Sequence, residues 1–419
     1  MNNHALSIDK MAICRCAVIN DGVFKNFIFF ILLFIYLINI KLFFSDLPIF
    51  YFLSPLGLLL LGKDFLTGKA YKGVVNFFIL IFIFFVIGLI SFLVNQYNDF
   101  FFFREFFIYT ILSLFYVRFL VYLYFKFFPA GNIDKIFYLG VFCVFLQLCL
   151  SLAAFLNPAF YNILFSIFSD NVQLDNVESF AKMRLIALGT PFFGSAILNC
   201  FILIVAAEYL IKNEKKYLFF LMALVIMMLG LFSARSTIFG IICFVLLVLT
   251  QFFNKSTYKY FVFGGGVLFL GSIVISSYLQ NLDALIKFGF GFLTDFSSSQ
   301  ASDSVSDLQS MYEILPNNIK TWLIGDSLYR DVNTGFYYQD TDVGFLRIIF
   351  VNGIIGLIIF LSIHFYVLLE INKKYISTIA KLLLAGILVV LNAKGVTNLL
   401  PYLLLIYLFS IYDPNKIKV

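Results

Sequence analysis

The sequence predicts an all-α, polytopic integral membrane protein with about twelve transmembrane helices and one large loop on the outer, periplasmic side. Of its 419 residues, 62% are hydrophobic and only 12% are charged, and the mean hydropathy is +0.99. Soluble domains carry about 25% charged residues. The apolar runs are continuous and do not alternate, which favours membrane helices over a β-barrel.

The predicted spans follow the apolar runs, each roughly 20 residues long. They cover residues 27–40, 47–62, 74–94, 104–125, 136–157, 187–211, 217–232, 236–253, 260–279, 342–369, 377–393 and 396–412. No small-residue cleavage site follows the first run, so we interpret it as a retained helix and not a signal peptide. The chain thus divides into three parts: a first helical part with a cytoplasmic N-terminal tail (1–279), the large loop (280–341) and a second helical part with a cytoplasmic C-terminus (342–419).

The lysines predict the orientation in the membrane. Lysines gather in every second gap between spans and in both tails: Lys63, Lys69, Lys72, Lys126, Lys135, Lys212, Lys215, Lys216, Lys255, Lys259, Lys373 and Lys374, with Lys10, Lys25, Lys416 and Lys418. The other gaps hold Lys41, Lys182, Lys287, Lys320 and Lys394. This positive-inside pattern predicts an inner-membrane-type protein with both termini in the cytoplasm. The net charge of +6 therefore reflects topology and not nucleic-acid binding.

The arginines follow a different pattern. Arg184, Arg235, Arg330 and Arg347 fall on or near the outer side, where lysine is sparse. Arginine is the residue suited to bidentate capture of phosphate and carboxylate groups, so this gathering suggests a site for such a group. The alternative is that these residues are interfacial anchors whose charged ends reach the membrane surface.

The large outer loop, residues 280–341, has two parts of different composition. SSSQASDSVSD, at 297–307, is predicted to be a flexible linker. WLIGDSLYRDVNTGFYYQDTD, at 322–342, is rich in aromatic residues and glycine and is predicted to be ordered. We interpret this second part as a lid or substrate-binding loop, with a loop of no direct function as the alternative. The chain contains no P-loop, GxGxxG, HExxH or GxSxG context.

Three stretches and the span layout carry a resemblance to a known family. They are RLIALGTPFFGSAILN from Arg184, FSARSTIFGIICF from Phe232 and TDVGFLRIIFVNGIIGLIIF from Thr341. The first resembles an arginine followed by a Gly/Pro entry into a span. The second resembles a short outer turn with arginine, and the third a Gly-x-x-Arg helix entry with Gly-Ile-Ile-Gly. With one large outer loop, this pattern resembles the Wzy-type polymerases of bacterial O-antigen and capsule.

The resemblance implies a membrane glycosyltransferase. Such enzymes transfer a growing glycan from undecaprenyl diphosphate onto the sugar end of another lipid-linked repeat unit. They use neither a nucleotide sugar nor a metal, so no cofactor is expected. The implied partners are the undecaprenyl-diphosphate-linked glycan and the lipid membrane, with a chain-length regulator and a flippase as further possible partners and no nucleic acid.

On this interpretation the outer arginines contact the diphosphate. Arg347, Arg184 and Arg235 lie at predicted outer helix ends, where they can stabilise the charge that develops on the leaving diphosphate. Arg330, within the loop, is a further substrate-binding candidate. A lipid-linked substrate places its diphosphate at this depth.

Carboxylates and tyrosines near these arginines complete the expected site. Asp342, with Asp340 and Asp326 as further candidates, could receive the proton of the acceptor hydroxyl. On a helix, Asp342 and Arg347 would not share a face, and a helix-dipole role is the alternative for Asp340 and Asp342. A last set could stack on sugar rings or simply pack within the loop: Tyr329, Tyr337 and Tyr338.

Two other functions stay open. The related O-antigen ligase joins finished glycan to lipid A-core and typically carries a histidine in the large outer loop, whereas this chain has only His4 and His364. A flippase or other transporter predicts charged residues deep within the spans. Arg118 and Lys381 are the candidates for such residues.

Overall fold

The chain is helical wherever its structure is described. The computed structural model describes residues 5–41, 47–68, 71–96, 99, 102–167, 184–186, 188–190, 192–213, 217–250, 303–331 and 334–414. Over these residues there is no β-strand, and isolated bridges join only Lys41 to Pro48 and Arg330 to Tyr337. The helical class predicted from composition is confirmed.

Six helices are long and apolar enough to cross a membrane, counting η1 and α4 as one continuous span. They are α2 (Ile49–Leu66), α3 (Lys72–Asn95), η1 with α4 (Phe103–Ile108 and Tyr109–Phe127), α5 (Ile133–Leu156), α8 (Phe193–Lys212) and α15 (Gly344–Glu370). Shorter apolar helices are the second half of α1 (Ala5–Ile38), α9 (Tyr217–Ser233), α10 (Thr237–Leu249), α16 (Thr378–Asn392) and α17 (Leu400–Tyr412). These helices indicate a membrane protein, because water would not solvate so much apolar surface.

Each of these apolar helices falls on a predicted span. The predicted span 260–279 and the first part of the large loop lie outside the described residues. The chain enters α8 later than predicted, because the described residues 184–186, 188–190 and 192 are not helical. The loop prediction at 297–307 is wrong in part, because Asp303–Tyr312 forms helix α13. Residues 158–167, which follow the predicted span 136–157, form helix α6 (Pro158–Ile167).

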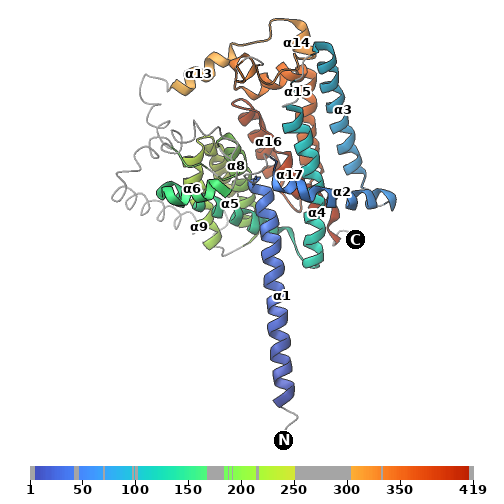
Figure 1. The fold of residues 1–419 in the computed structure, drawn as a ribbon, viewed down its shortest axis with the longest axis vertical. Coiled ribbons are helices and arrows are strands. Elements are labelled where there is room, and N and C mark those ends of the chain that lie inside the picture. The colour runs from blue at the N-terminus through green and yellow to red at the C-terminus, as the bar shows by residue number, and fades with distance from the viewer. Residues whose placement is uncertain are drawn as a thin grey trace.

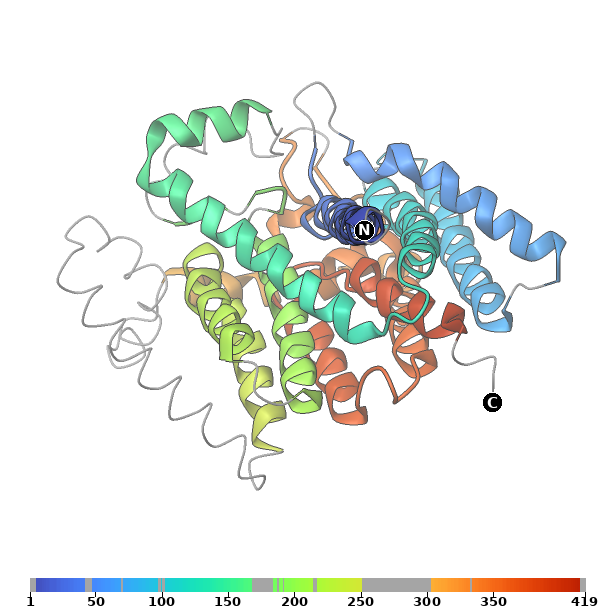
Figure 2. The same cartoon turned by 90° about the horizontal axis from the view of Figure 1, so that it is seen from below.

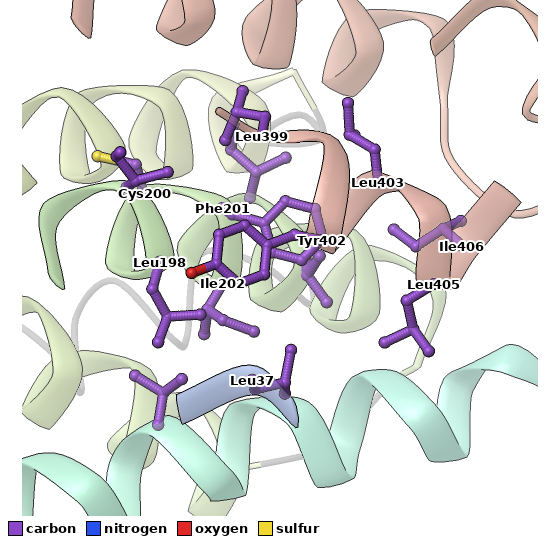
Figure 3. Close-up of a cluster of buried hydrophobic side chains, with 14 of the residues drawn as sticks. Leu37, Leu198, Cys200, Phe201, Ile202, Leu399, Tyr402, Leu403, Leu405 and Ile406 are labelled. Carbon is purple, nitrogen blue, oxygen red and sulfur yellow. The ribbon is translucent and has the colours of Figure 1, made fainter. Parts of the chain in front are cut away.

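The helices form two groups joined at the centre. α3, α4, α15 and α17 pack on one side, and α5, α8, α9 and α10 pack on the other (Figure 1). α2 packs against α4 but runs across this first group (Figure 2). The two groups meet in a core of buried side chains from α1, α8 and α17, where Phe201 and Tyr402 stack with ring centres 5.4 Å apart (Figure 3). This shared core fixes the two groups relative to each other.

The loop that precedes α15 packs on one end of the molecule, at the top of Figure 1. It contains α13, the short helix α14 (Ile319–Leu323) and the 3₁₀ turn η3 (Tyr338–Asp340). We call this the loop end of the protein. The described part of 322–342 packs against α15, as the prediction of an ordered segment requires. Residues 332–333 lie outside the described residues.

A break in α15 receives this loop. Gly353 has φ +68°, and a Cβ there would lie 2.1 Å from the carbonyl oxygen of Leu323, so only glycine fits. The amides of Asp326 and Ser327 donate to the carbonyls of Phe350 (2.5 Å) and Val351 (3.2 Å). The loop therefore satisfies backbone groups that the kink leaves without helical partners.

A buried ion pair joins α2 to α4, and the last residue of α17 adds a hydrogen bond to it. Arg118 Nε donates to Asp64 Oδ2 at 2.9 Å, and the Tyr412 hydroxyl donates to the same oxygen at 2.8 Å. The Arg118 guanidinium also lies 3.8 Å from the centre of the Tyr412 ring. Arg118, one of the deep charges that the transporter interpretation needed, thus has its charge compensated within the helix packing.

We predict that this pair is a stability element. Asp64→Asn leaves the Arg118 charge buried without its counter-ion, which costs about 3–5 kcal/mol. The melting temperature of the detergent-solubilised protein should fall clearly. Glu105→Gln is the matched control, since the Arg104–Glu105 pair is half exposed and such pairs contribute only about 0.2–1 kcal/mol. Equal melting temperatures for Asp64→Asn and wild type would contradict the prediction.

Candidate functional site

The first turn of α15 carries a guanidinium enclosed by two aromatic rings. The Arg347 guanidinium carbon lies 3.8 Å from the centre of the Tyr329 ring and 3.6 Å from that of Tyr337. Both tyrosines come from the loop, and residues 330 and 337 pair as an antiparallel bridge. A cation between two ring faces is stabilised by both quadrupoles and has little freedom to move. The sequence therefore builds a fixed positive charge at this helix end.

Arg347 is buried, with 6% of its surface exposed, yet it is not fully satisfied by hydrogen bonds. Its Nη1 lies 4.0 Å from Asp342 Oδ1, while Nε and Nη2 have no hydrogen-bond partner among the described residues. Asp342 precedes the helix, so the expectation that the two residues would face apart is wrong. Burial raises the pKa of Asp342, and the charges of Arg347 and Lys394 oppose that rise.

Further cations lie at the same end of the molecule. Arg184, Arg235 and Lys394 are close enough to act on one another's charge. Burial and then the charge of Arg235 lower the pKa of Arg184 to about 10, and burial, Arg235 and Arg184 lower the pKa of Lys394, which Asp342 partly restores. Arg184 therefore remains a cation at neutral pH. We call Arg184, Arg235, Lys394 and Arg347 the cationic group, with Asp342 as the carboxylate between Lys394 and Arg347.

Segments distant in sequence are brought together to form this group. The amide of Leu185 donates to the carbonyl of Phe232 at 3.0 Å, which places the entry to α8 beside the α9–α10 turn. Gly344, at the start of α15, packs directly on the backbone of Gly395. The Tyr312 hydroxyl, at the end of α13, donates to the carbonyl of Ala393 at 2.5 Å. These packing contacts hold the like charges near one another despite their repulsion. The gathered cations create a positive field that suits an anion.

A polar cavity lies next to Arg347 and the two tyrosines that enclose it. Its volume is about 410 Å³, and we call it the central cavity. It is lined by Asn39, Phe102, Glu105, Phe106, Gly189, Thr190, Gly194, Tyr329, Arg330, Tyr337, Val396 and Asn398. Tyr329 and Tyr337, which contact Arg347, thus form part of the cavity wall, and Arg330 borders the cavity. Gln147 donates to the carbonyl of Leu188 and to Thr190 and so fixes another wall.

Glu105 is a site residue that the sequence analysis missed. It lies in η1, a π-helical turn that leads into α4, and its carboxylate accepts from Arg104 Nη2 at 2.9 Å. Single π-helical turns inside α-helices often mark functional sites, because the extra residue re-aims nearby side chains. The signal was present in the sequence: Arg104 and Glu105 are a charged pair inside the apolar run DFFFFREFFIY.

A second cavity, of about 420 Å³, opens between α3, η1 and α15. We call it the phenylalanine groove, and it is lined by Phe84, Phe85, Gly88, Leu89, Phe92, Asp99, Phe102, Phe103, Ser327, Val351 and Asn352. Its walls are almost entirely apolar, with polar groups from the loop end. Phe102 borders both the groove and the central cavity. The two spaces therefore adjoin at this ring.

Asp99 joins the groove to the loop. Its Oδ2 accepts from the amides of Tyr329 and Arg330, both at 2.7 Å. The Asp99 carboxylate thus fixes the backbone of Tyr329, one of the two tyrosines that enclose Arg347. Burial raises the pKa of Tyr329 to about 12, against the opposing effect of Arg347, so its hydroxyl stays protonated.

The remaining predicted residues have distinct placements. Asp326 accepts from the hydroxyl groups of Thr321 (2.7 Å) and Tyr338 (3.4 Å), and Tyr338 packs edge-on against Phe350. These two residues thus make contacts within the loop end. Asp340 is exposed and has φ +50°. Arg330 is exposed at the rim of the central cavity.

The other charged candidates are used in packing. His364 is fully buried, where Nδ1 contacts the carbonyl of Phe360 at 2.8 Å and Nε2 accepts from the amide of Leu399. Lys381 Nζ donates to the carbonyls of Leu369 and Ile371 at the end of α15. Within the described residues, no group of three or more His, Cys, Asp or Glu side chains is placed to hold a metal ion.

Comparison with known proteins gives no relative for this chain: no protein family, curated protein or solved structure matches it. The function must therefore be inferred from the geometry of the site.

Proposed function

We propose that this protein is a polysaccharide polymerase that joins undecaprenyl-diphosphate-linked repeat units at the outer face of the bacterial inner membrane. The growing glycan is transferred onto a new lipid-linked repeat unit, and undecaprenyl diphosphate leaves. Both termini lie in the cytoplasm, and the loop end faces the periplasm. A flippase would supply the repeat units, and a chain-length regulator is a further partner.

The observation that carries this proposal is the cationic group beside the central cavity. Cleavage of the bond between the sugar and the diphosphate places negative charge on the departing oxygen. Fixed cations in a site of limited water access stabilise such charge and do not need to reorganise during the reaction. Arg347 is held between Tyr329 and Tyr337, and a guanidinium matches phosphate oxygens in two-point contacts.

The cations take different parts in this proposal. Arg347, Arg184 and Arg235 stabilise the diphosphate, and Lys394 adds to their field. Arg330, at the rim of the central cavity, contacts the incoming lipid-linked substrate. Asp342, 4.0 Å from Arg347, orients the guanidinium and offsets part of the repulsion among the cations.

The phenylalanine groove gives the lipid tail a place next to this site. An isoprenoid chain is apolar, and a groove walled by aromatic and aliphatic side chains excludes water from it. Because Phe102 borders both spaces, a tail in the groove places its polar head at the central cavity. The exposed apolar residues Phe82, Leu89 and Leu93 on α3 extend the apolar surface beside the groove.

An O-antigen ligase performs the same bond cleavage and differs in its acceptor, so the two functions are separated by their products. The direct test deletes the gene and resolves the surface glycan on a gel. We expect core bearing a single repeat unit and no ladder, with the ladder restored by the wild-type gene. Bare core with long lipid-linked polymer in the membrane would instead establish a ligase, and single units trapped on the cytoplasmic leaflet would establish a flippase.

The Arg347 variants test the cationic group. Arg347→Ala in the complemented strain should abolish the ladder while the protein stays in the membrane, because losing one such donor costs on the order of 10²–10³-fold in rate. Arg347→Lys should restore activity poorly, since an ammonium cannot make two-point contacts or stack in the same way. Ladders like wild type from both variants would remove Arg347 from the proposed site.

Gly88 allows the groove to be filled. A Cβ at Gly88 would meet only Asn352 Oδ1, at 3.5 Å, so Gly88→Leu should fold and place its side chain in the groove. We expect labelling by a photoactivatable polyprenyl phosphate to fall on the order of tenfold, which corresponds to about 1.4 kcal/mol of binding free energy.

The control for this change is Gly386→Leu on α16, where a Cβ would meet no atom within 4 Å. Gly386→Leu should be labelled like wild type. Equal labelling of both variants would show that the tail does not use the groove.

A further inference from the structure

We propose that Glu105 is the catalytic base of the proposed transfer: its carboxylate takes the proton of the acceptor hydroxyl inside the central cavity. This inference rests on the proposed polymerase function and assigns a residue that it requires. The reasons are the position of Glu105, its separation from the cationic group and the backbone that presents it.

The position of Glu105 is the first reason. Glu105 is the one acidic side chain among the described residues that line the central cavity. Neither Asp342, Asp340 nor Asp326 belongs to that lining. A base must reach the hydroxyl from which it takes a proton, at hydrogen-bond distance or through one water. The acceptor sugar is too polar for the phenylalanine groove, so the central cavity is where its hydroxyl can lie.

The second reason is charge separation across the cavity. η1 forms one wall with Phe102, Glu105 and Phe106, whereas the entry to α8 and residues 396–398 form others. The cationic group belongs to the side built by the α8 entry, the α9–α10 turn, the 393–395 turn and the head of α15. Tyr329 links the two, since its ring contacts Arg347 and its side chain lines the same cavity as Glu105. Asp342, in contrast, sits among the cations and compensates them.

The reaction then uses both sides of the cavity. The acceptor oxygen forms a bond to the anomeric carbon of the donor glycan, while the bond from that carbon to the diphosphate oxygen breaks. The electron pair of the broken bond stays on the diphosphate, beside the cationic group. The proton of the acceptor hydroxyl passes to the Glu105 carboxylate and from there to water. With base and leaving group on different walls, the transfer inverts the anomeric configuration in a single displacement.

The third reason is that the local backbone is specialised at this residue. The turn Phe103–Ile108 is π-helical, whereas Tyr109–Phe127 continues as a regular α-helix. The wider turn places Arg104 and Glu105 at the loop end while Phe102 and Phe106 stack on each other with ring centres 5.8 Å apart. Arg104 contacts one carboxylate oxygen, Oε1, through an ion pair that is half exposed and therefore weak.

The test compares three variants with wild type in the deletion strain and in membranes supplied with lipid-linked repeat units extracted from that strain. Glu105→Gln should lower the rate of polymer formation about 10²–10⁴-fold, the usual contribution of a general base. Glu105→Asp should keep part of the activity. Arg104→Gln, which removes the ion pair and leaves the carboxylate, should stay within severalfold of wild type.

Two further readouts separate chemistry from folding. Glu105→Gln should match wild type in its melting temperature and in labelling by the photoactivatable polyprenyl phosphate. The linkage formed by the wild-type enzyme should have the anomeric configuration opposite to that of the lipid-linked donor.

Several results would overturn the proposal. Polymer formation by Glu105→Gln at the wild-type rate would exclude the base role while leaving the polymerase function intact. An equal loss in Glu105→Gln and Arg104→Gln would show that the ion pair matters and not the carboxylate. A deletion strain whose ladder the wild-type gene does not restore would remove the polymerase function itself, and the Glu105 assignment with it.

Discussion

The structure of the loop end depends on one buried cation, Arg347. Removing a guanidinium from water costs several kcal/mol even after relaxation, while each ring face returns about 0.5–2 kcal/mol. Two tyrosines and Asp342 therefore have to be held around it. The break at Gly353 receives residues 325–327, and the Asp99 carboxylate fixes the two amides beside the first tyrosine. The kink in α15, the loop and the segment after α3 thus all help to hold Arg347 in place.

A loop built in this way is a wall of the site. Gly325 has φ +85°, and a Cβ there would lie 2.5 Å from the backbone of Val351, so the loop backbone approaches α15 as closely as sterics permit. From this contact the chain runs directly to Ser327, which borders the phenylalanine groove, and to Tyr329, which borders the central cavity. The same segment therefore shapes both spaces, and movement of the loop would alter both together.

The sequence was sufficient for features that depend on composition and on position along the chain. Hydropathy located the described apolar helices, and the scarcity of lysine on one side directed attention to Arg184, Arg235 and Arg347. The sequence was insufficient for features that long-range packing between helices determines. The π-helical turn at Glu105 follows from how η1 packs against α3 and α15, and the meeting of Asp342 with Arg347 follows from the start of α15 at Gly344. Lys394 joined the cationic group only because its turn packs on Gly344, a contact that no periodicity reveals.

The separation of charges explains why the site needs so many elements. In the proposed transfer, a base placed inside the cationic group would be a weaker base, because neighbouring cations favour its ionised form. Glu105 lies on η1, apart from the cations at the α8, α10 and α15 ends, and its own ion pair with Arg104 is half exposed and therefore weak. Tyr329 contacts Arg347 with its ring and lines the same cavity as Glu105. In the proposed reaction, helix packing sets the distance between base and cations, and so the core shared by α1, α8 and α17 contributes to the proposed chemistry.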